Sequence, residues 1–160
     1  MPSFDITSEF NQQEVTNAID QMNREIVNRY DFKNTNTSVN FSNEIILLKS
    51  NTEERLLAAD QVLREKFAKR NVSIKFLSNF SDEQTTSEVK REYTLKSGLD
   101  KEMSKIIVKD LKDFSKKLQS SIQNESIRIT SKKRDELQDA ISFLKSKNYK
   151  VFLIYGNFRD

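Results

Sequence analysis

Five consecutive residues in the first half of the chain could contact a flat, negatively charged ligand. They are Arg29, Tyr30, Asp31, Phe32 and Lys33. Aromatic rings stack on nucleobases, and an arginine can pair bidentately with a phosphate or with the edge of a guanine. The carboxylate of Asp31 could accept hydrogen bonds from the N–H donors of a guanine. In the alternative interpretation, the two rings fill the space beneath a loop and Arg29 forms an exposed ion pair with Asp31.

Two further groups, both in the second half of the chain, offer similar chemistry. Phe158 and Arg159 again place a ring beside a cation, which makes them candidates for the same ligand. The other group directly follows a serine predicted to cap a helix, and consists of Lys132, Lys133 and Arg134. The free N–H groups at a helix start attract anions, and these cations would add to that attraction. An ordinary surface helix is the alternative interpretation.

A row of lysines is predicted along one face of a helix. Its members, called the lysine row below, are Lys101, Lys105, Lys109, Lys112 and Lys116. At 100° per residue they fall within about 80° of arc, roughly opposite the apolar residues of the same segment. The row could neutralise the phosphates of a nucleic acid, with Arg128 as a further candidate, and such binding would weaken steeply with salt. Alternatively, the lysines form the solvated back of a helix.

The composition argues against several kinds of catalytic and metal site. The 160 residues include no cysteine and no histidine, which removes disulfides, thiolate ligands and the usual base near neutral pH. With only two glycines, the chain has no glycine-rich loop that could cradle phosphates. We therefore expect a protein that is not an enzyme and that uses no cofactor and no bound metal.

Hydropathy gives an expectation for the compartment. The first ten residues carry two acids and lack the basic and apolar regions of a secretory signal. No apolar stretch of 18 residues could span a bilayer. We expect a cytoplasmic protein without a membrane partner.

An internal repeat predicts the elements that position the candidate residues. When Asn43 is set over Asn124, an offset of 81 residues, the helical patterns that follow the two asparagines coincide. The matched pairs are Ser50 with Ser131, Leu56 with Leu137, Ala59 with Ala140 and Leu63 with Leu144. The two serines are predicted as N-caps, and the copies are predicted to end in strands around Ile74 and Val151.

Each copy predicts a helix, two strands, a helix and a strand, preceded by a first strand at 2–6 or 88–96. The order βαββαβ is the ferredoxin-like pattern, an α+β fold with a four-stranded antiparallel sheet and two helices on one face. We predict a tandem of two such domains, residues 1–86 and 87–160. The first copy has extra residues between its first helix and second strand, and this inserted loop contains residues 29–33.

The chain resembles the YajQ family of small bacterial proteins. The residues that carry the resemblance are MPSFDI, RYDFKN, SKIIVKDLKD, SIRITSKKRDELQ and the terminal NFRD. The resemblance implies two ferredoxin-like domains similar to RNA-binding modules, with their N-terminal strands exchanged between the two sheets. It also implies nucleotide binding, with cyclic di-GMP as a ligand of some members and nucleic acid proposed for others. It brings no catalytic residues with it.

The sheets lack the aromatic residues with which ferredoxin-like modules bind single-stranded RNA. The segments EIILLKS and SIRIT contain no ring. Ile46 and Leu48, like Phe152 and Ile154, are predicted to lie opposite the helix-facing residues. Both faces of each sheet would then be apolar, and the two domains or two subunits would cover them.

Net charge is unevenly divided, because residues 1–86 carry −3 and residues 87–160 carry +6. Anionic partners should therefore prefer the second half. We predict a nucleotide-binding regulatory protein whose ligand is a guanine nucleotide such as cyclic di-GMP, with GTP or ATP as other candidates. A binder of structured RNA such as tRNA or rRNA, using the lysine row, is the alternative. A third hypothesis is a protein-interaction adaptor that needs no small ligand.

Overall fold

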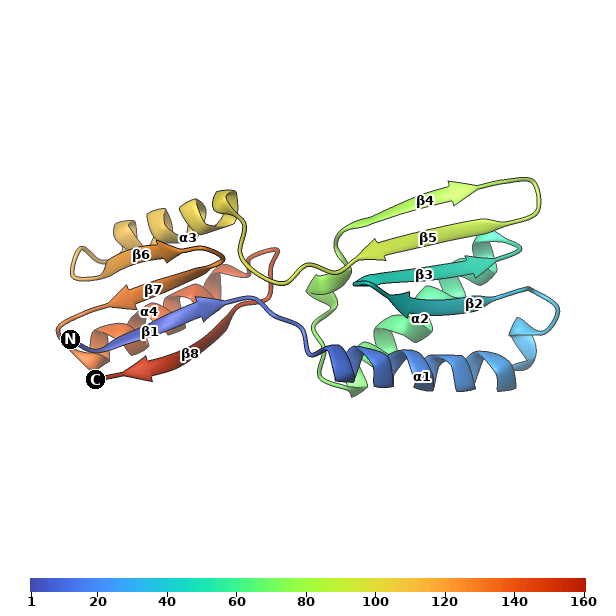
Figure 1. Ribbon diagram of the computed structural model, residues 1–160, viewed down its shortest axis with the longest axis horizontal. Helices are drawn as coiled ribbons and strands as arrows, with labels where there is room; N and C mark the ends of the chain where they lie inside the picture. Colours follow the sequence, from blue (N-terminus) through green and yellow to red (C-terminus); the bar gives the residue numbers. More distant parts are fainter. The chain divides into compact units, whose positions relative to one another are not determined.

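A computed structural model describes residues 1–160 and has eight strands, four α-helices and two short 3-10 helices (Figure 1). In the first half these are β1 (Ser3–Thr7), α1 (Gln12–Asn28), η1 (Tyr30–Phe32), β2 (Ser38–Ser42), β3 (Ile45–Ser50), α2 (Glu53–Lys69), η2 (Ile74–Leu77) and β4 (Phe80–Gln84). In the second half they are β5 (Val89–Thr94), α3 (Lys101–Phe114), β6 (Gln119–Gln123), β7 (Ser126–Thr130), α4 (Arg134–Lys147) and β8 (Ile154–Arg159). The predicted α+β tandem of ferredoxin-like units is confirmed.

The two sheets exchange their first strands. One sheet has the order β6-β7-β1-β8 and the other the order β2-β3-β5-β4, with every neighbouring pair antiparallel. β1 therefore lies between two strands from the far end of the chain, and β5 lies between two strands of the first half. The exchange implied by the family resemblance is present.

The chain forms two compact units, residues 10–96 and residues 1–9 with 97–160. We call them the first unit and the second unit. The domain boundary predicted between residues 86 and 87 separates the two copies of the sequence repeat, whereas the units are divided differently. The exchanged strands place residues 1–9 and 87–96 in the unit opposite to their own copy.

Three of the four α-helices begin with a side-chain cap. Asn11, Thr52 and Asp100 each accept a hydrogen bond from a backbone N–H in the first turn of the helix that follows. The prediction that Ser50 and Ser131 are N-caps is wrong. Both serines are buried, three residues before the first residue of the helix: Ser50 is the last residue of β3, and Ser131 directly follows β7.

The two copies of the repeat align at β-hairpin turns. Asn43 and Glu44 join β2 to β3 and have φ angles of 50° and 64°. Two successive positive φ values are those of a type I′ turn, whose twist matches that of the flanking strands. Asn124, with φ of 53°, joins β6 to β7 together with Glu125, but only the first of these two residues has a positive φ, as in a type II′ turn. The repeated asparagines thus mark two-residue turns at the same place in both copies.

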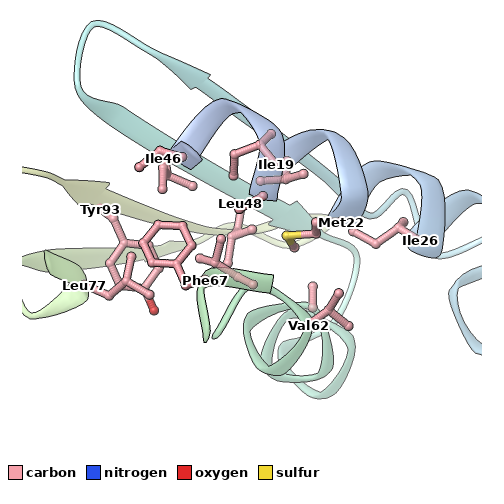
Figure 2. Close-up of a cluster of buried hydrophobic side chains, with 14 of the residues drawn as sticks. Ile19, Met22, Ile26, Ile46, Leu48, Val62, Phe67, Leu77 and Tyr93 are labelled. Atoms are coloured by element: carbon pink, nitrogen blue, oxygen red, sulfur yellow. The ribbon is translucent and has the colours of Figure 1, made fainter. Parts of the chain in front are cut away.

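The core of the first unit lies between its two helices and one face of its sheet (Figure 2). Ile19 and Met22 of α1 and Phe67 of α2 point toward strand residues that include Leu48 and Tyr93. All five side chains are buried. Burying such side chains contributes about 1.5–3 kcal/mol each, which fixes both helices on this face.

The second unit repeats this arrangement with a smaller core. Phe4 and Ile6 of β1 lie beside Ile127 and Ile129 of β7, and all four are fully buried. Helices α3 and α4 cover them through apolar residues that include Ile107. Because β1 supplies the middle of this sheet, two residues from the start of the chain hold the core of the second unit together.

At the ends of the repeats one predicted strand is wrong and the other is displaced. Ile74 and Phe76 lie in the 3-10 helix η2, whereas the strand predicted around Val151 is present as β8 but begins at Ile154. The fourth strand of the first sheet is β4, which lies just before the predicted domain boundary at residues 86 and 87 and was not predicted as a strand. β4 is exposed along its whole length, and its polar sequence FSDEQ lacks the alternation on which strand prediction depends.

β3 has apolar residues on both faces as predicted, but the predicted assignment of its faces is reversed. Ile46 and Leu48 face the helices and are fully buried, whereas Ile45, Leu47 and Lys49 alternate with them on the other face and are half-buried. The strand pairing surrounds Ile45 and Leu47 with Ser42, Asn40, Glu92 and Thr94. This face is therefore mixed in polarity, and it carries no aromatic side chain.

None of the α-helices combines the length and the apolar character needed to cross a bilayer. No group of three or more carboxylates within residues 1–160 is arranged to hold a metal ion.

Candidate functional site

The second unit brings together two candidate groups that are far apart in sequence. Ser3 of β1 pairs with Thr130 at the end of β7 on one side and with Arg159 at the end of β8 on the other (Figure 1). Because α4 begins shortly after Thr130, the end of β8 lies near the start of α4. The guanidinium of Arg134 forms an ion pair with the side-chain carboxylate of Asp160. We call the resulting group of five residues the α4-start cluster; it consists of Lys132, Lys133, Arg134, Phe158 and Arg159.

Phe158, the aromatic residue of this cluster, contacts the core on one side and is exposed on the other. The Phe158 ring stacks on the buried Phe4 ring, with centroids 5.9 Å apart and planes 30° apart. Phe158 is nevertheless 58% exposed. A ring supported by the core on one side can stack with a planar group on the other. The four cations of the cluster are exposed as well.

The helix start in this cluster differs from the other three. Lys133 occupies the N-cap position of α4 and makes no side-chain cap hydrogen bond. Ser131, which could have capped it, instead donates its hydroxyl to the Glu136 carboxylate. The first-turn N–H groups of α4 therefore have no cap side chain in front of them, next to three cationic side chains.

Arg128 lies on the face of the second sheet that points away from the helices. Its guanidinium donates to the two carboxylate oxygens of Asp5 at 2.9 and 3.3 Å. The Asn157 amide donates to the same carboxylate at 2.7 Å. The hydrogen bond from Arg128 is the main reason that the pKa of Asp5 lies below its ordinary value. Arg128 thus has a carboxylate partner, supplied by the exchanged strand β1.

The inserted loop is part of the first unit and has its own network of charges. The Arg29 guanidinium donates to both carboxylate oxygens of Asp31, at 2.7 and 3.0 Å, and to Glu25 at 3.0 Å. Arg55 of α2 contacts the Asp31 carboxylate at 3.2 Å from a position 24 residues away. Hydrogen bonding to Arg29 lowers the pKa of Asp31. Two arginines therefore already engage the carboxylate that was suggested as a guanine acceptor.

The two rings of this loop have different surroundings. Phe32 is buried, with the Arg29 guanidinium 4.9 Å from its ring centroid. Tyr30 is 84% exposed, with the Lys33 ammonium 5.5 Å from its ring centroid. Phe32 thus anchors the loop and Tyr30 is the ring available to a ligand. The role of Tyr30 in binding stays a prediction.

The lysine row is exposed along α3 and just beyond it. The helix ends at Phe114, so Lys116 belongs to the connection to β6 rather than to the helix. The opposite side of α3 carries the buried Ile107 and Leu111. None of the five lysines makes an ion pair within residues 1–160. Their charge is therefore not neutralised by the protein itself.

A buried polar network in the first unit was not anticipated. The Tyr93 hydroxyl and the Arg64 guanidinium contact the carboxylate of Asp60, and Arg91 lies 3.6 Å from it. Arg91 also forms a bidentate pair with Asp82 of the edge strand β4, at 2.7 and 2.9 Å. One signal of this network is present in the sequence, because Asp60 lies among the apolar residues that form the buried face of α2.

The strand exchange redistributes charge between the units. The second unit has 14 basic and 11 acidic residues, and the first unit has 13 of each. The net charges are therefore +3 and zero, rather than the +6 and −3 of the two sequence halves. The second unit is still the more cationic, and it contains both the α4-start cluster and the lysine row.

Comparisons with known proteins cover almost the whole chain. A family model described as nucleotide-binding protein YajQ-like matches residues 2–159. A nucleotide-binding protein of Hahella chejuensis is 40% identical over 161 residues, covering 100% of both chains. One from a Parafrankia species is 42% identical over 159 residues, covering 99% of this chain and 98% of its own. One from Coxiella burnetii is 38% identical over 160 residues, covering 100% of both chains.

Proposed function

Because the chain belongs to the YajQ-like family of nucleotide-binding proteins, we propose that it binds a nucleotide at the α4-start cluster. The relatives compared above are named as nucleotide-binding proteins over the same full length, which supports a nucleotide as the class of ligand. The ligand we propose is a guanine nucleotide such as cyclic di-GMP, which the protein binds in the cytoplasm without chemical change.

The observation that carries this proposal is the meeting of the last residues of the chain, Phe158 among them, with the start of α4. Phosphates would lie against Lys132 and Lys133 and the first N–H groups of the helix. A guanine would stack on the exposed face of Phe158. Arg159 follows on the opposite face of β8, on the side of Asp5, and adds positive charge near the site. The cluster thus combines phosphate and base contacts within one unit.

Isothermal titration calorimetry with cyclic di-GMP, GTP and ATP tests the proposal. We expect Phe158→Ala, and Lys132→Ala combined with Lys133→Ala, each to weaken binding about tenfold or more, since base stacking alone is worth about 1–3 kcal/mol. Lys105→Ala with Lys109→Ala removes the same charge from the same unit and serves as the matched control. Absence of binding by all three nucleotides would overturn the proposed function.

The inserted loop gives the main competing location for the same ligand. Tyr30→Ala removes the exposed ring of the first unit and leaves the α4-start cluster intact. We expect this variant to bind as the wild-type protein does. If Tyr30→Ala loses binding while Phe158→Ala still binds as the wild type does, the ligand class stands and the site lies in the inserted loop.

Structured RNA is the second candidate, because no acid neutralises the lysine row. Affinity for tRNA should then fall steeply between low and physiological salt. Reversing the charge at Lys105 and Lys109 should abolish this affinity, whereas reversal at Lys132 and Lys133 should weaken it less. If the affinity for tRNA changes neither with salt concentration nor with charge reversal in the lysine row, this function is excluded.

A further inference from the structure

β6 is a sheet edge without a feature that blocks pairing with another strand. It forms one edge of the second sheet and pairs only with β7, in a regular register over all five residues. Its sequence QSSIQ contains no charge and no proline, and Ile122 is 44% exposed. Edge strands usually carry charges, prolines or bulges that prevent such pairing. β6 has none of these.

Two of the other three edges are protected. β8 has a register irregularity opposite Ser3 and Asp5, and Asn157 there has a φ of 51°. β4 carries Asp82 and Glu83. β2 carries no charge and no proline either, and α1 packs on it as α3 packs on β6. α1 has a single cation, Arg24, whereas α3 carries most of the lysine row. β6 is therefore the unblocked edge that lies beside a strongly cationic helix.

The geometry of the hairpin tells which backbone groups of β6 are free. A two-residue turn makes its flanking residues, Gln123 and Ser126, a hydrogen-bonded pair, and such pairs alternate along an antiparallel ladder. Ser121 and Gln119 therefore bond to β7. Ser120 and Ile122 direct their N–H and C=O groups away from β7, toward the open edge.

The lysine row runs beside this edge. In the helix layer α4 packs on β1 and α3 packs on β6 (Figure 1). The side of α3 that faces α4 is marked by the Phe114 ring, stacked 4.3 Å from the Phe143 ring, and by Asp110, which accepts a 2.6 Å hydrogen bond from the Tyr149 hydroxyl. At 100° per residue the lysine row lies about 160° around the helix from these two residues. It therefore points away from α4, on the side where the sheet ends at β6.

We propose that the β6 edge and the lysine row together bind an extended acidic segment of a partner protein, which adds to the second sheet as a fifth strand. The free backbone groups of Ser120 and Ile122 form the ladder with this segment. Acidic side chains on every second residue of the segment point to the helix side, where the lysine row neutralises them. Backbone pairing supplies affinity, and charge selects the partner.

The same observations disfavour two other occupants. Antiparallel pairing of β6 with β6 of a second copy would bring two rows of five lysines together, and like charges repel. An RNA would use the lysine row but would leave the free N–H and C=O groups of β6 unused. It would also find no ring on this part of the sheet, because Ser126, Arg128 and Thr130 of β7 are the neighbouring side chains on the open face.

Fluorescence anisotropy with the full chain and a labelled peptide of alternating glutamate and valine, about ten residues long, tests the proposal. We expect binding that is lost when lysine replaces each glutamate in the peptide. Ser120→Pro removes one outward N–H group, and we expect it to weaken binding about fivefold or more, the worth of one hydrogen bond. Ser120→Val keeps the N–H group and should bind as the wild type does. Reversing the charge at Lys105 and Lys109 should abolish binding.

Amide hydrogen exchange on the wild-type protein gives a readout that does not depend on Ser120→Pro folding correctly. Peptide binding should slow exchange at Ser120 and Ile122 more than at Ser121, whose N–H already bonds to β7. Equal protection along α3 without protection of β6 would overturn the proposal. Two other results would also overturn it. One is an RNA that binds the lysine row without slowing amide exchange in β6, and the other is a concentration-dependent dimer that Ser120→Pro abolishes.

Discussion

The hydroxyl of Tyr93 donates a hydrogen bond to the carboxylate of Asp60 inside the core of the first unit, where Tyr93 is fully buried (Figure 2). Arg64 donates to the same carboxylate at 2.9 Å, which balances its charge. The Tyr93 ring also contacts the Phe80 ring at 5.4 Å, and the Arg91 guanidinium lies 4.4 Å from the Phe80 ring centroid. This network links α2 to the central strand β5 and to the exposed edge strand β4.

Removing the carboxylate at the centre of this network should destabilise the first unit. We expect Asp60→Ala to lower the free energy of unfolding by about 2 kcal/mol, because the buried Tyr93 hydroxyl loses its acceptor and Arg64 loses its carboxylate partner. Asp82→Ala is the matched control, because its side chain is 45% exposed and its loss should cost much less. Chemical denaturation followed by circular dichroism measures both values. An equal effect of the two substitutions would contradict the central role of Asp60.

The Asp5 carboxylate should make stability depend on acidic pH. Arg128 and Asn157 hold the pKa of Asp5 below its ordinary value near 3.8 in the folded state. The stabilisation is therefore fully present above the unfolded pKa and is lost as the pH falls through the folded pKa. We expect Asp5→Asn to lower stability at neutral pH and to flatten the acid limb below about pH 4. Denaturation midpoints from pH 2 to pH 7 test this, and an unchanged acid limb would contradict it.

The buried tyrosines give an expectation of the opposite sign at alkaline pH. Burial raises the pKa of Tyr93, and the hydrogen bond to Asp60 adds to this effect. A raised folded pKa favours the neutral phenol, so its contribution is present below the unfolded pKa of about 10 and is lost as the pH rises above it. We expect the unfolding free energy to fall above about pH 10, and to fall less in Tyr93→Phe. Ultraviolet difference spectra would locate the ionisation in both proteins.

The turn between β2 and β3 places a glutamate where glycine is favoured. Glu44 has a φ of 64°, a conformation that costs a residue with a β-carbon about 1 kcal/mol. We expect Glu44→Gly to raise the free energy of unfolding by about 0.5–1 kcal/mol. Glu125→Gly in the equivalent turn is the matched control, because Glu125 has no positive φ and should lose stability instead. Thermal unfolding of the two variants distinguishes these outcomes.

Much of the fold follows from patterns that are local in sequence. Apolar residues at helical spacing identify α1 and α3, and the repeated asparagine turns place β2, β3, β6 and β7. β4 could not be recognised in this way, because its stability depends on pairing with β5 and on the Asp82–Arg91 contact rather than on buried side chains of its own. The exchange of strands was indicated only by the family resemblance, since periodicity does not identify the sheet that a strand joins.

The contacts of the candidate site were less accessible to sequence reasoning. The cationic and aromatic residues were identified by type, but their partners lie far along the chain. Arg128 meets Asp5 across 123 residues, and Asp31 meets Arg55 across 24. Such pairs are created by strand order and helix packing. Residue type and spacing could therefore identify a charged side chain but not the residue with which it forms an ion pair.

The position of β1 has a consequence for how the protein is made. β1 leaves the ribosome well before its two neighbours in the sheet, β7 and β8. Phe4 and Ile6 therefore cannot be buried in their native place until β7 and β8 have been made, and closing so long a segment of chain slows folding. For the same reason, neither half of the gene would encode a complete sheet.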